Sequence, residues 1–176
     1  HNLKNMSDNN SEKNGDRNSD KVNEEMTLLI ADDHPIFRQG LRQIVERVPN
    51  LRVVAEADSG DAALNQIRYL DPDIVILDLA MPGMDGLQVM ERLGERDRQP
   101  AVIIVTAFDD QAYLDRAMEL GARAYVLKDS AGDDMAACLE NVRRGERYIT
   151  PSLGSHTPMK PAAVGLDFEA LQTLTA

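Results

Sequence analysis

The fold is decided by residues 73–86, which read DIVILDLAMPGMDG. Ile74 to Leu77 is an unbroken apolar run rich in β-branched residues, which is typical of a strand buried on both faces of a parallel sheet. The run ends on a carboxylate, Asp78, and the proline and glycines that follow require a loop. Ligands of open α/β sheets bind at the carboxyl ends of the strands, so Asp78 is the first candidate functional residue.

Similar apolar runs occur on both sides of this strand, and each is followed by apolar residues at helical spacing. Asp109 is expected to cap the fourth helix, and Ser59 the second. Right-handed crossovers between alternating β and α units give a parallel sheet with helices on both faces. The sequence therefore predicts a doubly wound α/β fold with five parallel strands, the other four being 27–31, 51–57, 101–105 and 124–127.

The chain of 176 residues divides into three parts by composition. Residues 1–26 are rich in Asn, Ser, Asp, Glu and Lys without an apolar period, and we expect a disordered tail there. Residues 27–148 hold the βα units and form the predicted domain. Residues 149–176 combine prolines, glycines and hydroxyl residues with a short amphipathic stretch, which is typical of a linker that leads toward a further domain.

The composition narrows the classes of function. A net charge of −11 argues against binding of nucleic acid by this chain alone, because phosphate binding needs a basic surface. A single cysteine, Cys138, excludes an intramolecular disulfide and suits a reducing compartment. No apolar run approaches the roughly 20 residues of a membrane span, and no signal peptide is evident. We therefore expect a cytoplasmic protein without a membrane contact.

Polar side chains follow four of the five strands, namely Asp32, Asp33, Asp78, Thr106 and Lys128. Because the carboxyl ends of parallel strands share one edge, these side chains should converge. Three close carboxylates stay ionised only near a cation, and Mg²⁺ prefers oxygen ligands together with a phosphate. The set predicts a phosphoryl-transfer site, in which one carboxylate forms an acyl phosphate while Mg²⁺ and the lysine neutralise the transferring oxygens.

Four segments stand in order along the predicted domain, namely ADDHP (31–35), LDLAMPGMDG (77–86), VTA (105–107) and GARAYVLK (121–128). In these segments, residues 27 to 148 resemble the receiver domain of two-component response regulators. The DDHP segment (32–35) and the GARAY segment (121–125) resemble the NarL/FixJ subfamily, whose output is a LuxR-type helix-turn-helix, and residues 171–176 resemble the lead into such a domain. The resemblance implies the flavodoxin-like, CheY-like receiver fold with strand order 2-1-3-4-5.

The resemblance also implies a role for each acid. Asp78 would accept a phosphoryl group from a sensor histidine kinase. Asp33, Asp78 and the backbone carbonyl of Ala80 would ligate Mg²⁺, and Asp32 would act through a water molecule.

For the remaining positions, the resemblance implies that Thr106 and Lys128 bind the phosphoryl oxygens. Movement of Thr106 toward the phosphate would let Tyr125 rotate inward and so change the adjoining surface. The output would be transcription control through DNA binding by a C-terminal domain beyond this chain, with homodimer formation on phosphorylation as a further expectation.

Two other readings stay open. A stand-alone receiver could act in a phosphorelay or as a protein-binding switch. A haloacid-dehalogenase-type phosphatase also uses a strand-end aspartate, but it needs a second acid two residues on, where this chain has Ala80. Because Ala80 and Phe108 are apolar, we expect slow self-dephosphorylation and no turnover of phosphate esters. The chain lacks the glycine-rich motifs with which P-loop and Rossmann sites bind nucleotides.

Overall fold

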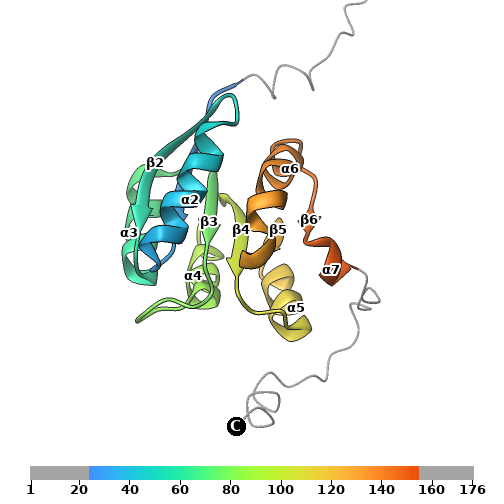
Figure 1. The fold of residues 1–176 in the computed structure, drawn as a ribbon. Helices are drawn as coiled ribbons and strands as arrows, with labels where there is room; N and C mark the ends of the chain where they lie inside the picture. The colour runs from blue at the N-terminus through green and yellow to red at the C-terminus, as the bar shows by residue number, and fades with distance from the viewer. Residues whose placement is uncertain (1–23, 155–176) are drawn as a thin grey trace, which may run out of the picture.

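The computed structural model describes residues 24–154, which form a parallel sheet flanked by helices on both faces (Figure 1). The tail predicted for residues 1–26 lies outside the described residues up to residue 23, and so does the predicted linker from residue 155 on. The predicted order 2-1-3-4-5 is confirmed, and a sixth strand extends it to β2-β1-β3-β4-β5-β6. The strands are β1 (Met26–Ala31), β2 (Leu51–Ala57), β3 (Ile74–Leu77), β4 (Ala101–Thr106), β5 (Ala124–Leu127) and β6 (Tyr148–Ile149).

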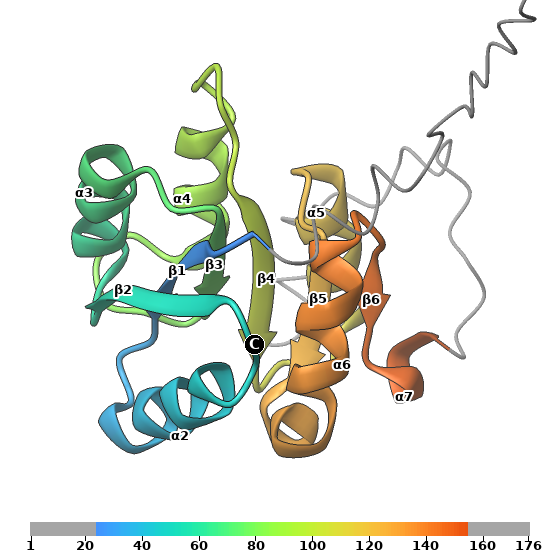
Figure 2. The same cartoon turned by 90° about the horizontal axis from the view of Figure 1, so that it is seen from above.

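Long helices cover both faces of the sheet (Figure 2). The first face carries α2 (Pro35–Glu46) and α6 (Ala131–Arg143), whose apolar residues share one core layer with the strands. The opposite face carries α3 (Gly60–Leu70), α4 (Gly86–Leu93) and α5 (Gln111–Glu119), which enclose the other layer. This is the doubly wound arrangement that the alternating pattern predicted.

The strands alternate their side chains between these two layers. In β3, Ile74 and Ile76 pack toward α2 and α6, whereas Val75 and Leu77 pack toward the other three helices. All four residues are buried, which confirms that this strand lies inside the sheet with both faces covered. The core is aliphatic apart from Tyr125, the largest fully buried side chain.

The structure confirms one of the two predicted helix caps and contradicts the other. The Ser59 hydroxyl accepts a hydrogen bond from the Ala62 amide at 3.2 Å, as its position before α3 predicted. The cap of α5 is Asp110, so the prediction of Asp109 is wrong. Asp110 has extended backbone angles, and its Oδ1 accepts the Ala112 amide at 2.8 Å, whereas Asp109 lies one residue too early.

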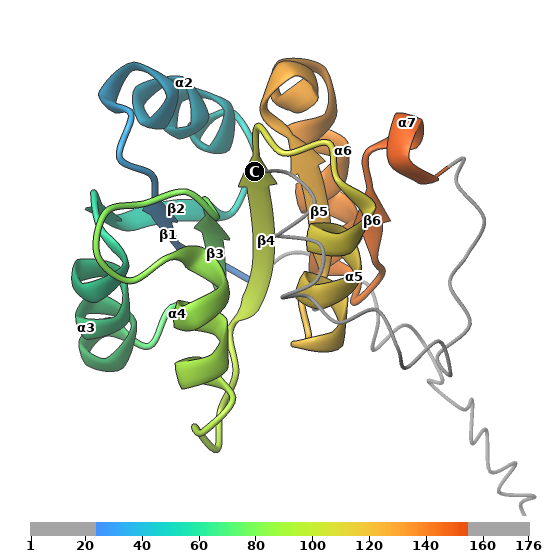
Figure 3. The ribbon, with the colours of Figure 1, turned by 90° about the horizontal axis from the view of Figure 1, so that it is seen from below.

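The predicted linker begins with ordered structure instead. β6 pairs in parallel with β5, and the short helix α7 (Pro151–Gly154) follows it at the edge of the sheet beyond β5 (Figure 3). The buried Thr150 accepts the Leu127 amide on its Oγ1 at 2.9 Å, and its own amide donates to the Tyr125 carbonyl at 2.9 Å. The folded unit therefore continues past residue 148, because β5 would otherwise expose an unpaired edge.

Candidate functional site

The carboxyl edge of the sheet brings together the acids and the lysine that the sequence singled out. Asp32 and Asp33 follow β1, Asp78 follows β3, and Lys128 follows β5 at the start of a 3₁₀ turn (Lys128–Ser130). β1 lies next to β3, and only β4 separates β3 from β5, so the ends of these strands lie close together. The convergence predicted from the strand order is therefore observed for these four side chains.

Lys128 is the cationic centre of this cluster. Its Nζ lies 2.8 Å from Asp32 Oδ2 and 2.9 Å from Asp78 Oδ2, and it also lies 3.2 Å from His34 Nδ1. The two carboxylates are almost fully buried, with 1% and 2% of their side chains exposed. Burial lowers the pKa of Lys128, but its contacts with Asp32 and Asp78 outweigh burial and raise the pKa above its ordinary value. The lysine is thus held as an ammonium ion.

Asp78 is the most constrained acid of the cluster. One oxygen accepts the Lys128 ammonium, and the other accepts the Ala80 amide at 3.1 Å. Burial raises the pKa of Asp78 above its ordinary value, the Lys128 contact lowers it, and the charge of Asp32 raises it again. A carboxylate that is poorly hydrated and close to a second acid is destabilised as an anion.

The acids form a cluster with the geometry of a cation site. Ligand atoms of Asp32, Asp33, His34 and Asp78 all lie within 4.8 Å of one another. Asp33 Oδ1 is buried without a hydrogen-bond donor in the described part of the chain, and its near neighbour is His34 Nδ1 at 3.0 Å. A carboxylate oxygen without a donor is free to coordinate, and three carboxylates suit a hard divalent ion such as Mg²⁺. The donor set therefore fits the predicted metal.

Ala80 and Thr106 are less directly tied to this cluster. The Ala80 amide donates to Asp78, but the predicted role of its carbonyl as a metal ligand stays a prediction. Thr106 ends β4 at the same edge and is fully buried. Its hydroxyl accepts the Phe108 amide at 3.1 Å and makes no hydrogen bond to Asp78 or Lys128. The structure thus shows Thr106 engaged with the loop that follows its strand.

Tyr125 is already buried in this arrangement. None of its surface is exposed, and its hydroxyl donates to the Phe108 carbonyl at 2.9 Å. Burial raises the pKa of this phenol well above its usual range, so the hydroxyl stays protonated and able to donate. The resemblance implied that Tyr125 turns inward once Thr106 moves. In this structure the inward tyrosine coexists with a Thr106 hydroxyl that accepts the Phe108 amide, and the coupled movement of the two residues stays a prediction.

The sequence analysis missed the contribution of the first turn of α2. Arg38 Nη1 donates to the Asp32 carbonyl at 2.6 Å, and its Nε pairs with Glu56 of β2 at 3.3 Å. The Phe37 ring lies under the Lys128 ammonium, 4.6 Å from ring centroid to Nζ. The signal was helical spacing, since His34, Phe37 and Arg38 stand at i, i+3 and i+4 directly after the acid pair and so share one face.

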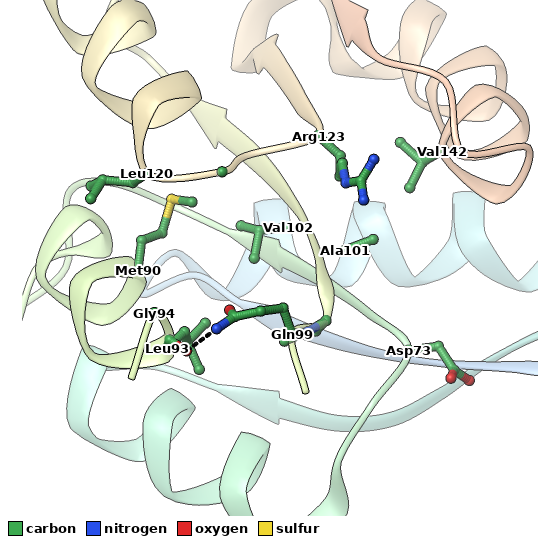
Figure 4. Close-up of a pocket in the computed structure, with 13 residues that line it drawn as sticks. Asp73, Met90, Leu93, Gly94, Gln99, Ala101, Val102, Leu120, Arg123 and Val142 are labelled. Atoms are coloured by element: carbon green, nitrogen blue, oxygen red, sulfur yellow. Dashed lines mark hydrogen bonds between the residues drawn. The ribbon is translucent and has the colours of Figure 1, made fainter. Parts of the chain in front are cut away.

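A separate cavity of about 440 Å³ lies at the opposite edge of the sheet (Figure 4). Its walls come from the start of β4 and the ends of α4, α5 and α6, and they include Asp73, Met90, Leu120, Arg123 and Val142. None of the clustered acids lines it. The acid cluster and this cavity are therefore different places in the molecule, and the chemistry expected from the acids belongs to the carboxyl edge.

Comparison with known proteins supports this assignment of the fold. Residues 28–140 match the family model described as the response regulator receiver domain. The nitrate/nitrite response regulator protein NarL of Escherichia coli (strain K12) is 33% identical over 141 residues, which cover 80% of this chain and 64% of that protein. This chain thus spans less than two thirds of the length of that curated relative.

Two solved structures have the same fold. A two-component response regulator of the LuxR family from Aurantimonas sp. SI85-9A1 aligns with a TM-score of 0.70 at 33% identity, covering 74% of this chain and 93% of that one. The isolated receiver domain of RcsB from Salmonella enterica serovar Typhimurium was solved with the phosphomimetic BeF3⁻. It aligns with a TM-score of 0.70 at 29% identity, and the alignment covers 74% of this chain and 96% of that one. The chain therefore belongs to the response regulator receiver domain family, with relatives of the NarL and LuxR type.

Proposed function

We propose that this chain is a phosphorylation switch in which Asp78 accepts a phosphoryl group from a sensor histidine kinase, with Mg²⁺ as the cofactor. The observation that carries the proposal is the ion pair of Asp78 with Lys128, 2.9 Å long, inside a cluster in which carboxylate oxygens of Asp32, Asp33 and Asp78 lie within 4.8 Å of one another. A single buried lysine cannot neutralise three acids, so the cluster calls for a further cation, which would also offset the charge that a phosphoryl group adds.

Asp33, Asp78 and the Ala80 carbonyl would hold the metal, and Asp32 would act through a water molecule. The bound ion would shield the negative charge of the incoming phosphoryl oxygens. Lys128 would keep its ammonium beside Asp78 and meet a phosphoryl oxygen from there. Thr106 would donate its hydroxyl to another oxygen after releasing the Phe108 amide.

In the proposed step, an Asp78 carboxylate oxygen forms a bond to phosphorus while the phosphorus–nitrogen bond of the phosphohistidine breaks. The imidazole of the kinase leaves with the electron pair of that bond and takes up a proton. Asp78 becomes a mixed anhydride, and the transferred phosphoryl group brings about two negative charges next to Lys128. The chain is thus a phosphoacceptor, and position 80 supplies no acid for turnover of phosphate esters.

The output of the switch belongs to the part of the protein beyond this chain. Since the NarL relative is a nitrate/nitrite response regulator of greater length, we propose a C-terminal DNA-binding domain that controls transcription in the cytoplasm. A homodimer formed on phosphorylation would bring two such domains together. Within the described residues, no helix has the length and apolar character needed to cross a membrane.

Incubation with acetyl phosphate and Mg²⁺, followed by intact mass measurement, tests the proposal. We expect one phosphate adduct on the wild type and none on Asp78→Asn. Asp85→Asn is the matched control, because Asp85 is a nearby aspartate that caps α4 and an asparagine caps equally well. Absence of an adduct on the wild type, or its persistence in Asp78→Asn, would overturn the assignment. Release of free phosphate from small esters by the wild type would favour the phosphatase instead.

A further inference from the structure

The Lys128 ammonium has an aromatic neighbour that the acid cluster does not explain. Its Nζ lies over the Phe37 ring, 4.6 Å from the centroid, while the same atom pairs with Asp32 and Asp78. Only 15% of the Lys128 side chain is exposed, so water competes weakly for the cation. A cation over an aromatic face within about 6 Å is attracted by the ring quadrupole, and the attraction grows when the pair is poorly hydrated.

Phe37 is placed there by the start of α2. The helix begins at Pro35, directly after the acid pair, and its interior residues Leu41 and Val45 are fixed in the core. Phe37 lies at the border of that core layer, partly buried against it. The ring is therefore held by the fold on one side and meets the ammonium on the other, which makes it a fixed support for a flexible side chain.

The ring acts on Lys128 in a way that the carboxylates cannot. A lysine has four rotatable methylene groups and three N–H donors, and each carboxylate contact occupies a donor. The attraction of a ring face needs no donor, so it restrains the ammonium while leaving N–H groups for a phosphoryl oxygen. Phosphorylation exchanges the Asp78 carboxylate contact of Lys128 for a phosphoryl oxygen, and the ring contact is available to hold the ammonium during that exchange.

We propose that Phe37 is a positioning residue for Lys128, whose ring holds the ammonium beside Asp78 and thereby sets the rate at which Asp78 is phosphorylated. This inference rests on the proposed function of Asp78. A purely structural alternative is that Phe37 fills space beside the core, in which case any apolar side chain of similar volume would serve.

Three variants separate these alternatives. Phe37→Leu keeps an apolar side chain and removes the ring, Phe37→Tyr restores a ring, and Ile36→Ala changes an exposed neighbour in the same helical turn. With acetyl phosphate as the donor at saturating Mg²⁺, we expect Phe37→Leu to slow adduct formation by about 5- to 30-fold, and Phe37→Tyr to stay within about twofold of wild type. Ile36→Ala should match the wild type.

A second readout tests the contact without phosphorylation. In the wild type the methylene protons next to Nζ of Lys128 should show upfield NMR shifts from the ring, which Phe37→Leu loses and Phe37→Tyr keeps. Thermal unfolding of each variant reports any loss of fold separately.

Equal rates in wild type and Phe37→Leu, or equally slow rates in Phe37→Leu and Phe37→Tyr, would overturn the inference while leaving the function of Asp78 intact. Lack of an upfield shift in the wild type would also overturn it. A wild type that forms no adduct at all would instead overturn the proposed function, and the role of Phe37 with it. Acetyl phosphate is used because a kinase would also sense changes in the surface of α2.

Discussion

The two edges of the sheet carry the same kinds of charged group and arrange them in opposite ways. At the carboxyl edge, one lysine faces three aspartates, and two of these acids are almost fully buried. At the amino edge, Asp71 and Asp73 pair with Arg96 and Arg98 at 3.1–3.2 Å, and these groups are half-exposed to exposed. The charges are balanced at the amino edge and unbalanced at the carboxyl edge.

The two sets of charges differ in what they cost the stability of the fold. Exposed, balanced pairs contribute little to stability, because water screens them and long side chains lose entropy when they pair. Buried, unbalanced acids cost stability, because each is drawn from water without full compensation. A fold keeps such a cluster where it has a use, which in the function proposed above is the binding of a cation and a phosphoryl group. Four substitutions test the contrast, from the largest expected effect to the smallest.

Lys128→Met should have the largest effect, because it keeps the length of the side chain and leaves Asp32 and Asp78 without their cation. We expect the free energy of unfolding in EDTA at neutral pH to fall by about 3 kcal/mol, the usual cost of removing one partner of a buried pair. Added Mg²⁺ should restore part of this loss. Urea unfolding with and without Mg²⁺ measures both effects. A loss of unfolding free energy no larger than that expected for an exposed ion pair would show that the two edges do not differ in this way.

Gly60→Ala should disturb the carboxyl edge through packing. A Cβ at Gly60 would collide with the backbone of Met84, in the loop between β3 and α4. We expect a loss of about 2 kcal/mol in the free energy of unfolding, together with slower phosphorylation, because the loop that follows Asp78 must move.

Gly40→Ala in α2 is the matched control, since no atom lies within 4 Å of its Cβ position. This variant should gain up to about 1 kcal/mol in unfolding free energy from better helix propensity. If both variants changed stability alike, close packing of the loop would not be the cause.

Asp78→Asn should stabilise the fold by about 1 kcal/mol at neutral pH, as removal of a strained functional charge often does. Because the pKa of Asp78 in the native state is above its ordinary value of 3.8, the native state binds this proton more tightly than the unfolded state. Wild-type stability therefore declines as pH rises from below 3.8 through the raised native pKa, and Asp78→Asn lacks this decline. The free energy of unfolding, measured for both proteins across the acidic range, should differ more as the pH rises. A difference that stays constant with pH would contradict the prediction.

Arg98→Ala at the amino edge should have the smallest effect. With 65% of its side chain exposed, Arg98 contributes less than about 1 kcal/mol through its pairs with Asp71 and Asp73. The measured difference from wild type should shrink further in high salt. A loss comparable to that of Lys128→Met would show that the two edges do not differ in kind.

Much of the fold and of the candidate site could be predicted because it depends on patterns of neighbouring residues. Buried strands are continuous apolar runs, and Asp78 and Lys128 follow two of them directly, so strand order alone brings these residues together. β6 could not be predicted, since a two-residue strand has no period and exists only by pairing with β5. The contacts of Phe37 and the state of Tyr125 also depend on side-chain placement across the fold, which no local pattern encodes.

Thr150 gives the chain a mechanical connection that its place after the last strand does not suggest. It is hydrogen-bonded to Leu127, the residue before Lys128, and to Tyr125. The backbone just before Lys128 is therefore supported by a residue that lies beyond the last strand. Loss of the Thr150 hydroxyl would remove the bond to Leu127 and leave the amide bond to Tyr125 in place.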